Sequence, residues 1–173
     1  MCVVGCHSPT GTDAKESAEG APLEAAESGV LARYGNGACY GACPVFSVTI
    51  YENGKVDFYG TEFTITKGGA SKTVSQETLE EIRSAFAKAD FIRAEAPVGR
   101  TASGSPKTGK SESFLYYAKD GKARRIDLPE GCEASPVAPP LMELRRRLDE
   151  LVEIEKWIGT AEERKVFGSG YAR

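Results

Sequence analysis

The sequence predicts a two-layer α+β domain in which two helices cover one face of an antiparallel sheet. Runs of alternating apolar and polar residues predict strands with one buried face and one open face. Each set of strands is followed by a helical pattern, which gives the order strands then helix, twice over. The 173 residues suit one such domain.

The first set of strands begins near Val30, and residues 30–34 predict a short strand. Residues 45–51 alternate, and residues 56–59 return after Asn53–Gly54, a dipeptide typical of hairpin turns because both residues tolerate positive φ. Residues 62–66 continue the alternation as a third strand, and a Gly–Gly pair then ends the pattern. We expect these strands to lie side by side.

The first helix is predicted over residues 76–89. Ser75 is a suitable N-cap, and Glu77 places a negative charge in the first turn, where the helix dipole favours it. The apolar residues recur at helical spacing. They are Leu79, Ile82, Phe86 and Ala89.

The second half repeats this order without sequence identity. Residues 114–117 and 123–128 predict strands joined by a turn at Asp120–Gly121. Pro139–Pro140 stands where proline is tolerated, at the start of a helix. One apolar stripe then predicts a single long helix. Its members are Leu141, Leu144, Leu148, Leu151, Ile154 and Ile158.

We therefore divide the chain into a tether at residues 1–29, one α+β domain at residues 30–158 and a flexible tail at residues 159–173. Val3–Cys6 resembles a bacterial lipobox, which makes Cys6 a candidate lipidation site. Between it and the domain, small and polar residues dominate, and such a composition cannot bury enough apolar surface to fold. These features predict a protein of the bacterial cell envelope, held to the membrane through an acylated Cys6.

Two other interpretations of the N-terminus stay open. Only five residues precede Cys6, whereas a signal peptide needs an apolar stretch of about 7–15 residues. If Met1 is the true start, the protein is cytoplasmic; otherwise the start lies upstream. Residues 2–7 also approximate a haem c attachment site, with three residues between the cysteines where two are usual.

The charge balance and the single histidine argue against several classes of function. The 22 basic and 25 acidic residues give a net charge of −3, which does not suit a nucleic-acid binder. The single histidine, His7, lies in the tether, so the domain lacks a histidine for nucleophilic catalysis or for the usual metal sites. We therefore expect no cofactor and favour a non-enzymatic role. The expected partner is an unidentified protein or envelope component.

Cys39 and Cys43 form a Cys-x-x-x-Cys pair directly before the first hairpin. The pair can be a structural disulfide, two free buried thiols or a redox dithiol. A zinc site needs four ligands, and only Cys132 remains in the domain. A catalytic dithiol usually lies at a helix N-terminus, and this pair precedes a strand. We favour a Cys39–Cys43 disulfide, with a thiol-disulfide redox protein as the alternative function.

The segment CYGACPVFSVTIYENGKVDFYG, residues 39–60, resembles the signature of an uncharacterised bacterial family, domain of unknown function 6438. Members carry a Cys-aromatic-Gly-x-Cys-Pro motif followed by a hairpin with a glycine turn. The resemblance extends from Leu31 to about Trp157. It implies a similar fold and an envelope location, and it implies no activity.

Two further motifs are weaker. Gly104 to Ser111 fits the P-loop pattern, but a P-loop needs a buried strand before it and a helix after it, and the neighbouring residues predict neither. Nucleotide binding is therefore only a second alternative function. Arg145–Arg147 is interpreted as a solvated helix face offset by nearby carboxylates, with contact to anionic lipid headgroups as the alternative.

Overall fold

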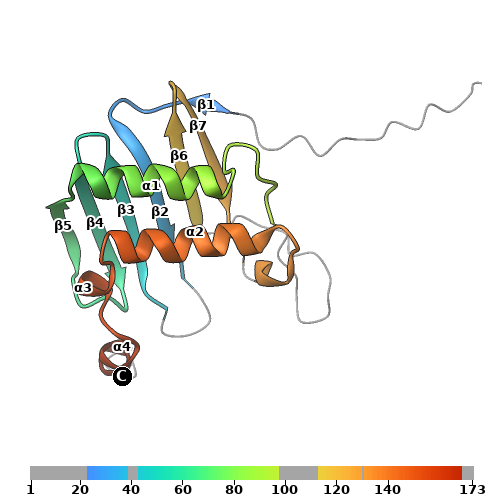
Figure 1. The fold of residues 1–173 in the computed structure, drawn as a ribbon. Coiled ribbons are helices and arrows are strands. Elements are labelled where there is room, and N and C mark those ends of the chain that lie inside the picture. Colours follow the sequence, from blue (N-terminus) through green and yellow to red (C-terminus); the bar gives the residue numbers. More distant parts are fainter. Residues whose placement is uncertain (1–22, 39–42, 98–112, 130, 169–173) are drawn as a thin grey trace, which may run out of the picture.

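The computed structural model describes residues 23–38, 43–97, 113–129 and 131–168. Within them, seven strands form one sheet, and helices α1 and α2 lie side by side on one of its faces (Figure 1). The strands are β1 (Glu24–Ala25), β2 (Val30–Asn36), β3 (Val45–Tyr51), β4 (Lys55–Glu62), β5 (Gly68–Thr73), β6 (Phe114–Lys119) and β7 (Lys122–Asp127). The helices are α1 (Gln76–Lys88), the 3-10 turn η1 (Cys132–Ala134), α2 (Ala138–Leu151), α3 (Glu155–Ile158) and α4 (Ala161–Gly168). The predicted α+β class is confirmed.

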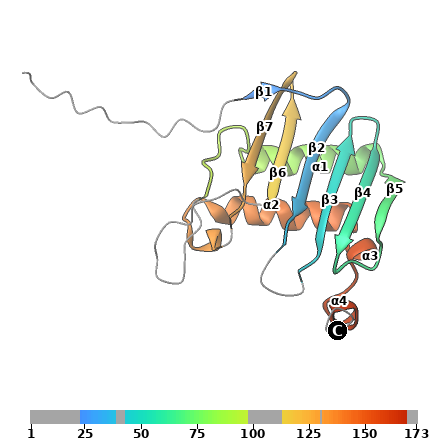
Figure 2. The same ribbon diagram turned by 180° about the vertical axis from the view of Figure 1, so that it is seen from behind.

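The sheet has the order β1-β7-β6-β2-β3-β4-β5, and all neighbouring strands run antiparallel. β2 lies in its interior, where Tyr34 is opposite Val48 of β3 on one side and Leu115 of β6 on the other. Seen from behind, the second face of the sheet is not covered by any described element (Figure 2). Within the described part of the chain, the sheet therefore has one buried and one open face.

Both predicted hairpins form. Gly54 has φ of 87°, and its amide donates a hydrogen bond of 3.0 Å to the Tyr51 carbonyl in the β3–β4 turn. In the β6–β7 turn Asp120 and Gly121 have φ of 51° and 73°, the left-handed pair that a two-residue hairpin turn requires. These turns fix the register of the flanking strands.

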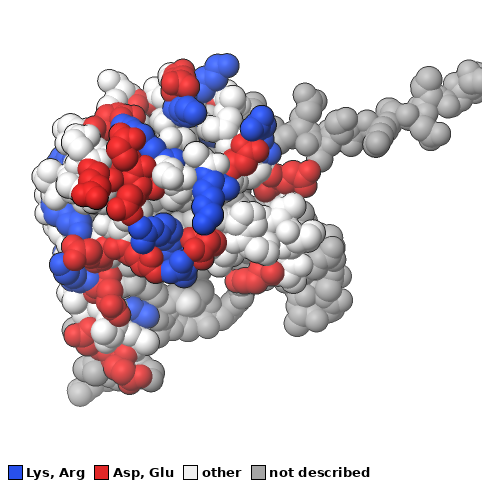
Figure 3. Space-filling view, viewed as in Figure 1, with Lys and Arg blue, Asp and Glu red and all other residues white. Residues whose placement is uncertain are grey.

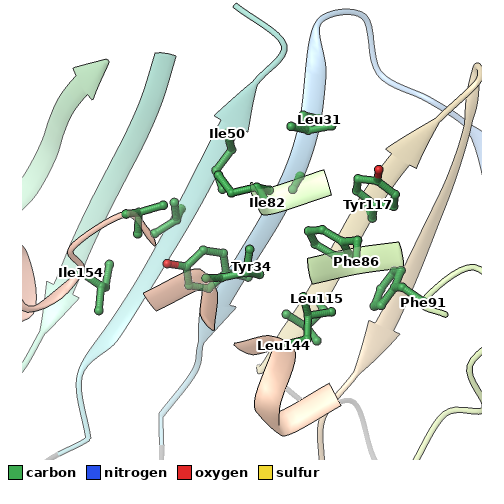
Figure 4. Packing of buried hydrophobic residues seen from close by; sticks show 14 of the residues in the cluster. Leu31, Tyr34, Ile50, Ile82, Phe86, Phe91, Leu115, Tyr117, Leu144 and Ile154 are labelled. Carbon is green, nitrogen blue, oxygen red and sulfur yellow. The ribbon is translucent and has the colours of Figure 1, made fainter. Parts of the chain in front are cut away.

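α1 begins as predicted. The Ser75 hydroxyl accepts a hydrogen bond of 3.1 Å from the Thr78 amide, which satisfies one of the free N–H groups of the first turn. The predicted apolar stripe faces the sheet, and Phe86 stacks on Tyr117 of β6 with ring centroids 4.1 Å apart. Figure 4 shows this contact within the core. Burying each such side chain stabilises the fold by roughly 1.5–3 kcal/mol.

The predicted third strand at residues 62–66 is wrong. β4 ends at Glu62, Phe63 adopts φ of 48°, and the next strand, β5, contains the glycines that were expected to end the pattern. The Thr66 amide donates to the Trp157 carbonyl at 2.9 Å, which holds the intervening loop against α3. β5 has no apolar alternation because its strand geometry comes from pairing with β4.

The predicted single long second helix is also interrupted. α2 ends at Leu151, and Glu153 adopts φ of 51° before α3 begins. The break turns α3 toward β4, where Trp157 stacks on Phe58 with ring centroids 5.1 Å apart. Part of the predicted flexible tail forms α4. The predicted tether at residues 1–29 is likewise wrong at its end, because Glu24–Ala25 forms β1 and pairs with β7. None of the helices in the described ranges has the length and apolar character needed to cross a bilayer.

Candidate functional site

The side chains that alternate with the buried ones lie on the open face of the sheet. The backbone of this face is turned toward the viewer in Figure 2. Strand register places these residues in rows that run across the sheet. One row consists of Asp127, Phe114, Gly35, Ser47, Tyr59 and Gly69. The next consists of Arg125, Tyr116, Arg33, Thr49, Asp57 and Ser71. Hydroxyls, aromatic rings, charged groups and small residues therefore share one face of the sheet.

The basic side chains of this face are paired with carboxylates that lie beside them. The pairs are Arg33–Glu27 at 2.5 Å, Lys55–Asp57 at 2.8 Å and Arg125–Asp127 at 2.9 Å. The hydrogen bond from Arg33 lowers the pKa of the Glu27 carboxyl. Exposed pairs of this kind contribute little to stability, but they leave the face without net charge from these six side chains.

Most aromatic rings on the open face are already covered by a cation. Arg125 lies 3.8 Å from the Phe114 ring centroid, Arg33 lies 5.8 Å from that of Tyr116, and Lys55 lies 5.5 Å from that of Tyr51. Tyr59 differs from these rings. Its side chain is 57% exposed, and no ring or cation contact to it is found within the described part of the chain.

A shallow depression of about 380 Å³ surrounds Tyr59. Besides Tyr59, its lining residues are Ser47, Thr49, Asp57, Phe58, Gly69, Ala70 and Ser71. A Cβ atom added at Gly69 would meet no other atom within 4 Å, so the space above this glycine is open. The open face therefore offers one free aromatic ring beside a hydroxyl-lined hollow.

Sequence reasoning predicted an open face but did not single out this hollow. Tyr59 was expected only as part of the returning strand at residues 56–59. The alternation shows which side chains share a face. The position of Tyr59 beside Gly69 depends on how β4 pairs with β5, a strand that the sequence did not predict.

Of the sequence-predicted site residues, Cys6 and Cys39 lie outside the described residues. Cys43 is described, is engaged rather than free, and leads into β3. A strand start gives a thiolate none of the stabilisation that a helix N-terminus provides. The Cys39–Cys43 pairing stays a prediction.

Cys132 is the free cysteine of the described residues. It is buried in η1, and burial raises the pKa of its thiol, which keeps it protonated and unreactive. Within the same ranges, no group of three His, Cys, Asp or Glu side chains is placed to hold a metal ion.

The P-loop-like segment, Gly104 to Ser111, also lies outside the described residues. The element that follows it is β6, a strand, and residues 94–97 before it are not a strand. The phosphate-binding form of this motif joins a strand to a helix, whose N-terminus faces the phosphates. The described elements nearest to the segment thus differ from the strand and helix that flank a P-loop.

The basic run on α2 is only partly solvated, so the predicted solvated face is wrong for Arg145. Arg145 is 8% exposed and donates a hydrogen bond of 3.2 Å to the buried Gly35 carbonyl. Its guanidinium lies 4.5 Å from the ring centroid of Tyr34 and 5.4 Å from that of Phe46. Asp149 pairs with it at 3.4 Å. This cluster fixes α2 to the ends of β2 and β3.

Burial governs the titration of this cluster. It raises the pKa of the Tyr34 hydroxyl well above its usual value, and it raises the pKa of Asp149, which the nearby Arg145 partly offsets. The cluster is packed beneath the helices, so we assign it to structure rather than to chemistry.

The other two arginines of the run are exposed and paired, Arg146 with Glu143 and Glu150, and Arg147 with Glu150 and Glu81. Figure 3 shows that acidic and basic residues are mixed over the helix-covered face. A surface of mixed sign offers little attraction to anionic headgroups, which favour clusters of positive charge.

The family model described as Domain of unknown function (DUF6438) matches residues 31–152. The match covers the strands from β2 to β7 together with α1 and α2, and so includes the open face. No curated protein and no solved structure matches the chain.

Proposed function

Because the chain belongs to the DUF6438 family, whose description assigns no activity, we propose its function from the molecule itself. The protein is a non-enzymatic binding domain that uses the open face of its sheet. It is displayed at the bacterial cell envelope by a tether whose Cys6 is acylated.

The main support for a binding role is the uncovered sheet face with its free Tyr59 ring. An antiparallel sheet can expose one face to water, and such a face is then usually polar. This face keeps several aromatic rings, and one of them has no internal partner among the described residues. Tyrosine is enriched at recognition surfaces because its ring is apolar and its hydroxyl is polar.

The N-terminal sequence supports display at the envelope. The lipobox-like residues 3–6 and the small and polar residues 7–22, which precede β1, have the composition of a lipid anchor and a spacer. The proposed Cys39–Cys43 disulfide fits the same location, because disulfides persist in oxidising compartments. The intact mass of the protein from membrane and soluble fractions, measured with and without reduction, tests both the acylation of Cys6 and the disulfide. A soluble, unlipidated protein with free thiols contradicts this part of the proposal.

Photo-cross-linking tests the binding face. A photoreactive phenylalanine analogue replaces Thr73, which lies on β5 on the open face, or Met142, on the exposed side of α2. Irradiation of cells producing the full chain is expected to give adducts from position 73 and none from position 142. Equal or absent cross-linking at both positions contradicts the proposal.

A thiol-disulfide redox protein is the alternative function, using Cys39 and Cys43. It requires a low thiol pKa and fast alkylation after mild reduction. Slow alkylation, at the rate of an ordinary thiol, excludes it.

A further inference from the structure

We propose that the depression around Tyr59 binds an uncharged carbohydrate, with one sugar ring against the tyrosine. This inference rests on the proposed binding function and names the class of ligand for that face. The residues that would contact it belong to β3, β4 and β5.

The ring of Tyr59 is free to receive a ligand. An aromatic residue opposite a glycine can fold over it and cover the gap between strands. Tyr59 lies directly opposite Gly69, but no atom lies within 4 Å of the Cβ position at this glycine. The ring therefore does not fill the hollow. A sugar ring has an apolar C–H face, which can take the place of that missing contact on an exposed aromatic ring.

The walls of the depression suit the edge of a sugar. Ser47, Thr49 and Ser71 each carry a group that can both donate and accept hydrogen bonds. Asp57 adds a carboxylate, which accepts several hydrogen bonds and uses only part of that capacity on Lys55. Sugar hydroxyls likewise both donate and accept. The hollow thus matches a ligand rich in hydroxyl groups.

Charge favours a neutral ligand over an anionic one. The described residues that line the depression include one carboxylate, Asp57, and no Lys or Arg. Beside it, Lys55 and Arg33 are each held by a carboxylate, and Lys67 donates to the Thr61 carbonyl. An anion would meet the Asp57 carboxylate without a free positive partner to offset it. A cationic ligand would have to compete with Lys55 for the same carboxylate.

The size and shape of the depression favour part of a chain rather than a whole small molecule. Its volume of about 380 Å³ is at the low end of ligand sites and leaves room for about one or two sugar rings. It is open and reaches the edge strand β5, so an oligosaccharide can extend past it.

NMR titration of the full ¹⁵N-labelled chain tests the proposal. The neutral probes are maltotriose, cellotriose and triacetylchitotriose, and the charged comparator is a hyaluronan tetrasaccharide. At least one neutral probe is expected to shift the amide signals of β3, β4 and β5 around Tyr59. The charged comparator is expected to cause smaller shifts.

Two variants and a matched control locate the site. Tyr59→Ser removes the ring, and Gly69→Val adds a side chain to the hollow at a position where a Cβ atom meets no other atom within 4 Å, so each is expected to weaken binding about tenfold or more. Tyr51→Ser removes a cation-covered ring from the same face and is expected to leave binding unchanged. Thermal unfolding checks that each variant is folded.

The proposal is overturned if none of the neutral probes shifts these signals, if the shifts lie elsewhere, or if both site variants bind as well as the parent. Concentration-dependent shifts of β4 and β5 without any sugar would instead identify a second copy as the occupant. If no neutral sugar binds but the variant with the photoreactive residue at position 73 still gives adducts, the carbohydrate assignment is wrong and the binding function stands.

Discussion

Removing the guanidinium of Arg145 tests whether the buried cluster, rather than the surface charges, secures α2. R145M keeps an apolar stem of similar length and removes three contacts of the charged group. These are the hydrogen bond to the Gly35 carbonyl, the stacking on Tyr34 and Phe46, and the pair with Asp149. We expect a large loss of stability from this single change.

The contacts set the size of the loss. A buried carbonyl left without its donor costs about 1–3 kcal/mol. Cation–π contacts of a desolvated arginine contribute about 1–2 kcal/mol. The carboxylate of Asp149 is 31% exposed, so this pair adds less than about 1 kcal/mol. The free energy of unfolding should fall by about 3 kcal/mol, which lowers the urea midpoint by about 1–2 M.

The neighbouring arginines provide matched controls. R146M and R147M remove exposed charges from the same helix, and each should cost less than about 1 kcal/mol. Urea unfolding followed by circular dichroism and by Trp157 fluorescence measures all three variants. If R145M unfolds at the same urea concentration as R146M, the structural role assigned to the cluster is wrong.

The loss in R145M should also depend on pH. Burial raises the pKa of Asp149 in the folded protein, so its contribution is most favourable below the ordinary value of 3.8 and is lost as pH rises through the raised value. Without Arg145 the folded pKa rises further, because the arginine lowers it. The deficit of R145M should therefore be larger at pH 7 than at pH 4. An equal deficit at both values would argue against coupling to Asp149.

Three further predictions concern packing, capping and reactivity. G60A places a Cβ atom 2.4 Å from the Thr66 carbonyl oxygen and should lower the melting temperature strongly, whereas G69A meets no atom within 4 Å and should not. S75A removes the N-cap of α1 and should cost about 1 kcal/mol in urea unfolding; an unchanged midpoint would show that the cap is dispensable. Cys132 should react with iodoacetamide only after unfolding, and rapid modification of the native protein would contradict its burial.

The sequence predicts the parts of this fold in which local pattern and tertiary packing agree. The alternation at residues 45–51, the Asn53–Gly54 turn and the stripe on α1 each have one periodicity, and each forms as predicted. β5 could not be predicted because its residues are small and polar. Its backbone is extended only because β4 supplies the hydrogen bonds. The end of α2 was missed because the helical stripe continues through a left-handed residue, Glu153.

The candidate site was less accessible to sequence reasoning than the fold. Of the residues singled out, Cys6, Cys39 and the segment from Gly104 to Ser111 lie outside the described residues, whereas Cys43 is described and precedes β3. The open face emerges only from the register of neighbouring strands. The burial of Arg145 likewise could not be predicted from local sequence. Three consecutive arginines have the same local pattern, and only the packing of α2 on the sheet determines which of them is buried.

The position of β2 within the sheet has a consequence for how the chain folds. One edge of β2 pairs with β3, which follows it closely in sequence. Its other edge pairs with β6, which begins only at residue 114, after α1. Pairings between segments distant in sequence form slowly because a long loop must close first. A nascent chain that has completed β5 therefore presents an unpaired β2 edge, which is open to intermolecular strand addition. The β6–β7 hairpin pairs with that edge, and α2, which follows it, covers the remaining part of the core. The last third of the chain must therefore be made before the open edge of β2 is protected.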